Sequence, residues 1–329
     1  MILARHAEAL LWAGRYLERA ETTARCLNVA TASIMHLVPT DAEVEWEQLI
    51  AALGLVDEFA SSEAELSVAA VRRFLLTDMD SPGSVRSAVS AVRENFRAVR
   101  DRIPVELWEE ANLLHLELAA YDARYLPTDR AYEVMTRVRR SCQAMAGVLS
   151  ESMLREEGHA FITVGQMIER AILNLELLKS ALGNRRNTFD ADRLLRSASA
   201  LQAFRRQHGH DDDWLDVSAF LIEDNTVPRS VLASVARVEN RLELVDVAGL
   251  LVEPRRLAGR LRSRLEYADL HAELADDAYG TVHGLGRDLM ALSAAIHTSL
   301  APPLAVPTLH AQYVRPGRDA APAETGAAT

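Results

Sequence analysis

The sequence predicts an all-α protein, a single helical bundle body built from two pseudo-repeated halves. Apolar residues recur at alternating steps of three and four along two long segments, which is the spacing of one helix face. Aromatic residues make up only 5% of the 329 residues, and Gly and Pro number 15 and 11, which disfavours a fold of aromatic strands and tight turns. Motifs of the first half also return in the second half at a nearly constant offset, as a duplicated unit should give.

The two longest helices are expected over about 3–37 and 156–182. The apolar seam of the first consists of Leu10, Ala13, Leu17, Ala20, Ala24, Leu27, Thr31 and Ile34. The seam of the second consists of Phe161, Val164, Ile168, Ala171, Leu175, Leu178 and Leu182. The seams superimpose after a shift of 151 residues, so each helix should present one face to a core.

Three motifs carry the repeat. Gly14 to Ala20 is echoed by Gly165 to Ala171, with Gly, Glu, Arg and Ala identical. In the second motif, Phe74-Leu75-Leu76-Thr77-Asp78 followed by Pro82-Gly83-Ser84-Val85 corresponds to Phe220-Leu221-Ile222-Glu223-Asp224 followed by Pro228-Arg229-Ser230-Val231. In the third motif, residues 92–101 correspond to residues 237–246. We therefore expect a first helical half over 1–150, a second over 151–300 packed on the first as one body, and a flexible Pro/Ala-rich tail over 301–329.

The remaining helices are expected over about 43–53, 63–76, 84–102, 105–120, 128–152, 189–207, 229–246, 253–273 and 277–299. Pro82 and Pro228 fit the first position of a helix, where a missing N–H costs nothing. Asp80 or Thr226 would then be the N-cap.

Composition excludes several classes of function. The formal net charge is −11, which argues against a nucleic-acid binder that relies on counterion release. No apolar stretch approaches the length of a membrane span, and the N-terminal apolar run is interrupted too early for a secretory signal, so we expect a cytoplasmic protein without a membrane partner. The two cysteines, Cys26 and Cys142, have neither disulfide nor zinc spacing and are expected in the core.

A polar stripe beside the first apolar seam is the main candidate site. Gly14, Glu18, Glu21 and Arg25 follow at steps of four, three and four. Because Gly costs about 1 kcal/mol in a helix interior, Gly14 and its counterpart should allow a backbone or a ligand to come close. In a functional interpretation Glu18 and Glu169 bind a cation or amine while Arg19 and Arg170 hold an anion. The structural interpretation is a helix contact with Glu21 and Arg25 as an i,i+4 pair.

A second candidate is the helical row of Arg93, Arg97 and Arg100, followed by Trp108. It is either an anion cleft or a charged outer face with Trp108 in the core.

Recognisable cofactor and catalytic motifs are missing. His208 to Asp213 is interpreted as a solvated acidic loop, so no metal is expected in this chain. Lys179 is the only lysine and no Walker-type loop is present, so no nucleotide cofactor is expected either. There is no nucleophile elbow, and neither cysteine has an identifiable histidine partner.

These residues together resemble the alpha-E family of bacterial all-helical proteins. The resemblance covers about 1–300. It rests on Ala7-Glu8, on Trp12, on Gly14-Arg15-Tyr16-Leu17-Glu18-Arg19-Ala20-Glu21, on Thr23-Ala24-Arg25, on Phe74-Leu75-Leu76 with Pro82, Ser84 and Val85, on Arg93-Glu94-Asn95 with Arg97 and Val99-Arg100-Asp101, on Trp108-Glu109, and on Gly165 with Glu169-Arg170-Ala171. The second copy departs from the first by having Gln166 and Ile172 at the positions of Arg15 and Glu21, so a single polar site should be dominated by the first copy.

The resemblance implies a companion of circularly permuted ATP-grasp proteins, which are encoded beside or fused to members of this family. ATP and Mg are then expected on that partner, which would activate a carboxylate and form an amide on a peptide or protein substrate. The candidate catalytic residues are Glu18, Glu21 and Glu169. The candidate ligand- or partner-binding residues are Gly14, Arg15, Arg19, Arg25, Arg93, Arg97, Arg100, Gly165 and Arg170.

Three hypotheses follow. The leading one is an accessory or substrate-binding subunit of an ATP-grasp-type peptide amide ligase, and any catalysis then belongs to an ATP-dependent carboxylate-amine ligase complex. The second is a stand-alone enzyme of amide transfer or hydrolysis with Glu18 as general base. The third is a homodimeric scaffold that associates through its Gly-containing long helices.

Overall fold

The computed structural model describes residues 2–34, 39–62, 64–122, 127–183, 190–210, 213–246 and 249–300. These segments contain helices and no strand, which confirms the predicted fold class. The expected tail over 301–329 lies outside the described residues. The elements are α1 Ala4–Ile34, α2 Pro39–Ala52, α3 Val56–Ser61, α4 Val68–Arg72, a π-helical turn Arg73–Thr77, α5 Val85–Ala98, a 3-10 turn Arg100–Arg102, α6 Val105–Ala119, α7 Thr128–Ser152, α8 Glu157–Gly183, α9 Ala191–Ser197, α10 Leu201–His208, α11 Trp214–Glu223, α12 Val231–Val245, α13 Val252–Tyr267 and α14 Leu270–Leu300.

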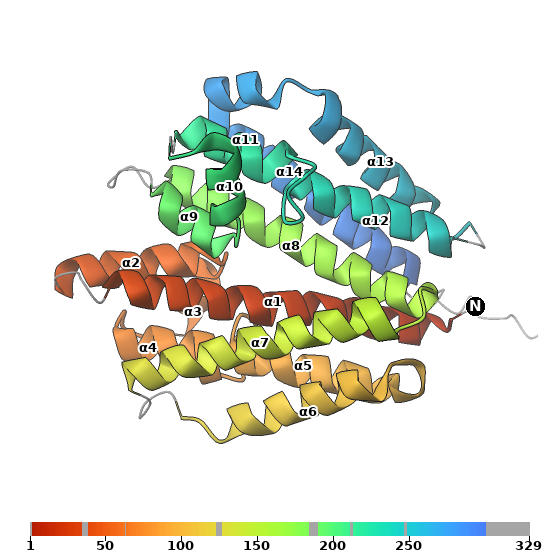
Figure 1. Ribbon diagram of the computed structural model, residues 1–329, viewed down its shortest axis with the longest axis horizontal. Helices are drawn as coiled ribbons and strands as arrows, with labels where there is room; N and C mark the ends of the chain where they lie inside the picture. Colours follow the sequence, from red (N-terminus) through yellow and green to blue (C-terminus); the bar gives the residue numbers. More distant parts are fainter. Residues whose placement is uncertain are drawn as a thin grey trace, which may run out of the picture.

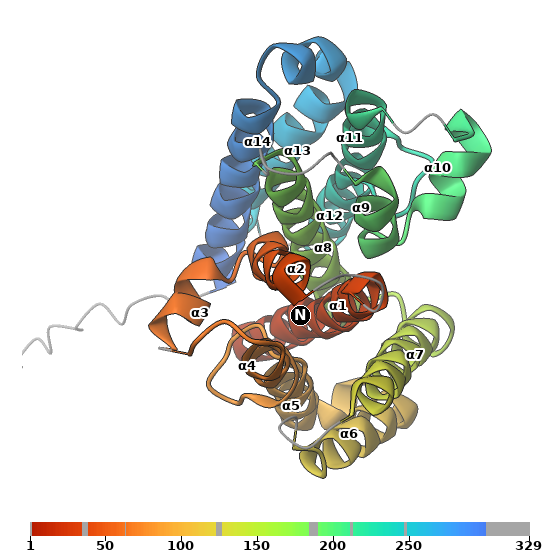
Figure 2. The same cartoon turned by 90° about the vertical axis from the view of Figure 1, so that its left-hand side faces the viewer.

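The long helices form two groups with the same order of contacts. In the first group α1 contacts α5 and α7, and α6 contacts both of those helices. In the second group α8 contacts α12 and α14, and α13 contacts both. The groups meet where α1 and α8 cross, so the second group (green to blue) lies above the first (red to yellow) in Figures 1 and 2.

Short helices complete the join between the two groups. Helix α2 contacts α8 as well as α1, and α9 contacts α1 as well as α8. The short segments of each half contain an equivalent aromatic contact. Phe59 and Phe74 pack edge to face in the first half, and Phe204 and Phe220 do so in the second, with ring centroids 5.1 Å apart in both pairs.

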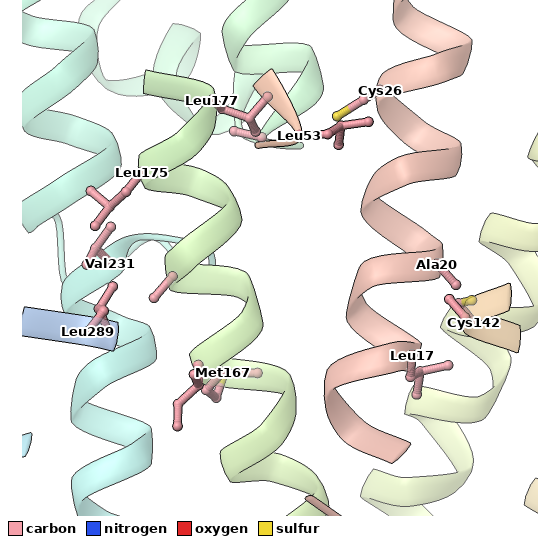
Figure 3. Close-up of a cluster of buried hydrophobic side chains, with 14 of the residues drawn as sticks. Leu17, Ala20, Cys26, Leu53, Cys142, Met167, Leu175, Leu177, Val231 and Leu289 are labelled. Atoms are coloured by element: carbon pink, nitrogen blue, oxygen red, sulfur yellow. The ribbon is translucent and has the colours of Figure 1, made fainter. Parts of the chain in front are cut away.

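Both predicted seams are buried. On α1 the residues from Leu10 to Leu27 that form the seam are all at most 2% exposed, and the α8 seam is buried from Phe161 to Leu178. The two cysteines are free and buried, as predicted, and Figure 3 shows Cys142 of α7 beside Ala20 of α1. Burial raises the pKa of the Cys26 thiol to about 11, so it is an inert core residue.

Several helix ends differ from the prediction. Helices α5 and α12 begin after Ser84 and Ser230, whose hydroxyls accept the N–H of Ser87 and Ala233 at 3.0 Å. The serines are therefore the N-caps, and the prolines two residues earlier lie in the preceding turns instead of in the first helical position. Asp80 and Thr226 are not caps, because each donates its backbone N–H to an aspartate two residues earlier.

Other differences follow from backbone breaks. The helix predicted over 189–207 is divided at Ser199, whose φ of 57° is left-handed. The helix predicted over 253–273 ends at Tyr267, and α14 starts at Leu270 and has a kink at Asp277. The segment 56–61, which was not predicted, forms α3.

Candidate functional site

Two glycines set the distance between α1 and α8. A Cβ on Gly14 would lie 2.1 Å from the carbonyl oxygen of Ile162, and a Cβ on Gly165 would lie 2.0 Å from the carbonyl oxygen of Leu11. Because no side chain fits in either place, the two backbones approach directly. The close approach predicted from these glycines is thus made by a helix of the same chain.

The Glu-Arg dipeptides that follow the glycines pair with each other. Arg170 donates to Glu18 through two nitrogens, at 3.0 and 2.7 Å. In the reciprocal pair Arg19 donates to Glu169 at 2.6 Å. The side chains of both glutamates are only 3% exposed. Each motif therefore neutralises the buried carboxylate of the other, which removes the large cost of burying an unpaired charge.

Further arginines extend the Glu18 pair into a larger cluster, here called the first cluster. Arg229 donates to Glu18 at 2.9 Å and to Glu21 at 3.0 Å. Arg25 pairs with Glu21 and also donates to the Ser197 carbonyl at 2.6 Å. The i,i+4 pair predicted for Glu21 and Arg25 is thus confirmed, but it belongs to a larger network.

Arg15, Arg19 and Glu169 form the second cluster. Arg15 donates to Glu169 at 2.8 Å and to Ser293 at 3.1 Å. Its guanidinium also lies 4.9 Å from the ring centroid of Trp12. His297 lies 3.3 Å from the same arginine, and burial together with the charge of Arg15 lowers the pKa of that imidazole.

Electrostatics hold Glu18 in its ionised form. Burial by itself would raise the pKa of this carboxyl, but Arg170 and Arg229 outweigh burial and lower it from 4.5 to about 2. For Arg229 burial would lower the pKa, and Glu18 and Glu21 outweigh it and raise the value. A general base works best with a pKa near the operating pH, so Glu18 is poorly suited to that role.

The second cluster borders an open hollow of about 740 Å³, here called the acidic groove. Its three cations are Arg15, Arg19 and Lys179. Its five carboxylates are Glu47, Asp57, Glu58, Glu169 and Glu176. Within the described residues Glu47, Asp57 and Glu58 form no ion pair, whereas Lys179 pairs with Glu176 at 2.5 Å. The groove therefore has uncompensated negative charge along the wall formed by α2 and α3.

The three other predicted arginines lie away from both clusters, and two of them contact α6. Arg93 donates to Asn112 of α6 at 2.8 Å. Arg93 and Arg100 lie 5.5 and 5.1 Å from the ring centroid of Trp108 on the same helix, while the side chain of Arg97 is 67% exposed. They form a charged face around a half-buried Trp108 and do not contribute to either cluster.

Arg229 is the residue of the network that sequence reasoning missed. The repeated Pro-x-Ser-Val motif holds Gly83 in the first copy and Arg229 in the second, and this difference was the available signal. The backbones of the two loops are held alike, because Thr23 donates to the Gly83 carbonyl and Asn174 donates to the Arg229 carbonyl. The side chain alone therefore distinguishes the two loops.

Within the described residues no group of three or more His, Cys, Asp or Glu side chains is arranged to hold a metal ion. Part of the His208 to Asp213 loop, residues 211–212, lies outside the described residues. In the same described part of the chain, none of the helices has the length and apolar content needed to cross a bilayer.

The paired Glu-Arg dipeptides and the all-helical fold define a known class of helical domain. The chain belongs to the Alpha-E family, described as a predicted alpha-helical domain with a conserved ER motif, which matches residues 2–300. Two Glu-Arg dipeptides fit that description here, Glu18-Arg19 and Glu169-Arg170, and the structure shows that they bind each other.

Mycobacterial relatives contain a matching region. An uncharacterized protein of Mycobacterium bovis is 27% identical over 316 residues, which cover 88% of this chain and 35% of the relative. An uncharacterized protein of Mycobacterium tuberculosis is 26% identical with the same coverage. The chain thus spans about a third of the length of the curated relatives that it matches. No solved structure matches it.

Proposed function

We propose that this chain is an accessory, substrate-binding subunit of an ATP-grasp-type peptide amide ligase system, with the acidic groove as its peptide-binding site. The observation that carries the proposal is the difference in access between the two Glu-Arg clusters. Glu169, Arg15 and Arg19 all line a groove of about 740 Å³, whereas Glu18 and the two arginines that hold it, Arg170 and Arg229, do not line it. Binding chemistry is therefore offered by the groove and by the second cluster.

The charges of the groove favour a peptide that carries an amine. Glu47, Asp57 and Glu58 provide acceptor oxygens without a cation among the described residues, and charge-assisted hydrogen bonds to an ammonium are the stronger kind. Arg15 and Arg19 at the opposite wall can hold a backbone carbonyl or a carboxylate, because each guanidinium keeps donors beyond those used on Glu169. An amine and a carbonyl are both present at the N-terminus of a peptide or at a basic residue.

Glu18 supports the accessory role over a stand-alone enzyme. A carboxyl whose pKa is held near 2 is not tuned for proton abstraction at neutral pH. The glycine faces predicted to join a homodimer are occupied, since Gly14 and Gly165 bring α1 and α8 together inside one chain. A homodimer would need another surface.

The relatives give further support. In the mycobacterial proteins the matched region is about a third of the chain, so the domain occurs joined to other protein. A domain without its own nucleotide motif that is fused to a larger protein fits a binding role beside a separate catalytic unit. The family resemblance names an ATP-grasp protein as that unit.

The test is co-expression with an ATP-grasp protein encoded beside this chain. The mass of the complex and the peptide-dependent release of ADP would be measured with and without this subunit. We expect a defined heteromer whose turnover requires this chain. A fully active ATP-grasp protein alone would refute the proposal.

A pair of variants tests the groove itself. Replacing Asp57→Asn together with Glu58→Gln should raise KM for the peptide about tenfold with little change in kcat, because the lost contacts concern binding. The matched control replaces Glu106→Gln and Glu253→Gln, two exposed carboxylates outside the groove, and should leave KM unchanged. Equal effects of both double variants would count against the groove.

A further inference from the structure

We propose that a second groove, rich in arginine, binds the acidic side chain of a peptide. This arginine groove has a volume of about 620 Å³ and lies between α1, α7 and the segment of α9 and α10. Its cations are Arg25, Arg139, Arg193 and Arg196, and its carboxylates are Asp190 and Asp192. The charge balance is thus the reverse of that in the acidic groove.

The two grooves occupy equivalent places in the fold. Tyr132 of α7 lines the arginine groove and Tyr279 of α14 lines the acidic groove. Both grooves also include a left-handed residue after a short helix, Ser199 with φ of 57° and Gly54 with φ of 68°. Because the backbone is alike, the difference in ligand preference must come from the side chains.

Substitutions at equivalent positions reverse the charge. On the first long helix Arg25 lines the arginine groove, and 151 residues later Glu176 lines the acidic groove. On the short helices Glu47 lines the acidic groove and Arg193 lines the arginine groove. The acidic groove is therefore suited to an amine, and the arginine groove at the equivalent place in the other half is suited to a carboxylate.

Two buried polar atoms in the arginine groove have no partner. Nε of Arg139 and Oδ1 of Asn28 make no hydrogen bond with the described residues, and Asn28 is only 4% exposed. Arg139 also forms no ion pair with any described residue. The other three arginines are engaged, Arg25 by Glu21, Arg193 by Glu45 and the exposed Arg196 by Asp192 at 3.0 Å. Buried polar groups without partners are uncommon and call for a ligand or water.

The groups that line the groove specify the ligand more narrowly than charge does. The Arg139 guanidinium has no carboxylate partner among the described residues and offers a fork of donors that fits a carboxylate. Asp190 and Asp192 in the same groove would repel a phosphate dianion more strongly than a single carboxylate. We therefore assign an acidic peptide segment to this site.

A third cavity adjoins both grooves. This central pocket of about 440 Å³ shares Gln48 and Ser180 with the acidic groove, and it shares Asp192 and Arg193 with the arginine groove. The two grooves are therefore neighbours that border the same pocket. In taking a peptide as ligand, this inference rests on the proposed function.

The experiment is a titration of the full chain, without any partner, with a fluorescent capped peptide that contains two glutamates. The same peptide with both glutamates replaced by glutamine is the ligand control. We expect Arg139→Gln and Arg196→Gln each to raise Kd about tenfold, as hydrogen bonds to a charged group should. Arg140→Gln, an exposed neighbour on α7, is the matched control and should leave Kd unchanged. Arg139→Lys should restore only part of the affinity, because lysine keeps the charge and loses the fork of donors.

Each contrary outcome overturns the assignment. Equal binding of the glutamate and glutamine peptides removes the carboxylate site, and equal effects of Arg139→Gln and Arg140→Gln reduce it to general surface charge. Competition by inorganic phosphate at concentrations similar to the peptide would indicate a simple anion site. Because no ATP-grasp protein is present, loss of this binding is distinguishable from failure of the accessory role, which is measured as ADP release.

Discussion

The two Glu-Arg clusters have the same motif and different surroundings. Glu18 is held by Arg170 and Arg229 in the first cluster. Glu169 is held by Arg15 and Arg19, and these three side chains line the acidic groove. The comparison shows that the motif joins the two long helices in both places. Neighbouring residues decide whether the glutamate and its arginines border that groove.

Single replacements explain much of this difference. Glu21 of the first cluster corresponds to Ile172 at the same helical position, and Ile172 lines the acidic groove. Arg229 corresponds to Gly83, which also lines that groove. The second cluster therefore lacks the second acid and the additional arginine of the first cluster, and the residues in their places border the acidic groove.

The largest effect is expected from the feature that both clusters share. Gly14→Leu would drive a side chain into the carbonyl oxygen of Ile162, 2.1 Å from the Cβ position, and backbone cannot move aside as a side chain can. We expect a loss of more than about 3 kcal/mol of unfolding free energy, measured by urea denaturation. Gly147→Ala on α7 meets nothing within 4 Å and should gain up to about 1 kcal/mol. Similar stability of the two variants would contradict the crossing described here.

Replacing each glutamate in turn compares the clusters directly. Glu18→Gln leaves buried arginines without their charge partner and should cost about 3 kcal/mol. Glu169→Gln should cost about 1.5 kcal/mol, because water in the groove can solvate Arg15 and Arg19. Both values come from urea unfolding at neutral pH. The comparison fails if Glu169→Gln is the more destabilised variant.

Acid stability should report the first cluster. Because the folded pKa of Glu18 is about 2 and its ordinary value is 4.5, the unfolded chain binds the proton more readily. The stability from this carboxylate is fully present above pH 4.5, falls as the pH drops from 4.5 to 2, and amounts to about 3 kcal/mol. When the unfolding free energy is measured as a function of pH, the Glu18→Gln variant should show a smaller decrease between pH 4.5 and 2 than the wild type does. A wild-type slope in that variant would assign the acid sensitivity to other groups.

A smaller effect than that of Glu18→Gln is expected from making the first cluster resemble the second. Arg229→Met removes one charge while Glu18 keeps Arg170 and Glu21 keeps Arg25. We expect a loss of about 1.5 kcal/mol and a rise of the Glu18 pKa, seen as acid unfolding at higher pH. Arg97→Met, on an exposed arginine, should change stability by less than about 0.5 kcal/mol. An equal change of stability in the two variants would show that Arg229 does not stabilise the first cluster.

The fold and part of the site were predictable for different reasons. Apolar periodicity is a local property of the sequence, so the α1 and α8 seams and the all-α class were predicted correctly. The polar stripe with Gly14, Glu18 and Arg25 was also recognised, because its residues lie on one helix face. The reciprocal pairing with Arg170 depends on where two helices cross, and helical spacing does not determine that point.

Arg229 and the grooves were beyond sequence reasoning. Arg229 reaches Glu18 across 211 residues of chain, and only the fold brings its loop beside α1. The grooves are formed by short helices and by left-handed residues such as Ser199, where propensity is a weak guide. Their opposite charges emerge once equivalent positions such as Arg25 and Glu176 are compared in space.

The reciprocal pairing of Glu18 with Arg170 and of Glu169 with Arg19 is the contact pattern of a two-fold interface between identical subunits. Here both sides belong to one polypeptide, so their association does not depend on protein concentration. Identical subunits would also have to carry the same residue in both grooves. A covalently joined pair is free of that restriction, and a glutamate on one side can face an arginine at the equivalent position on the other.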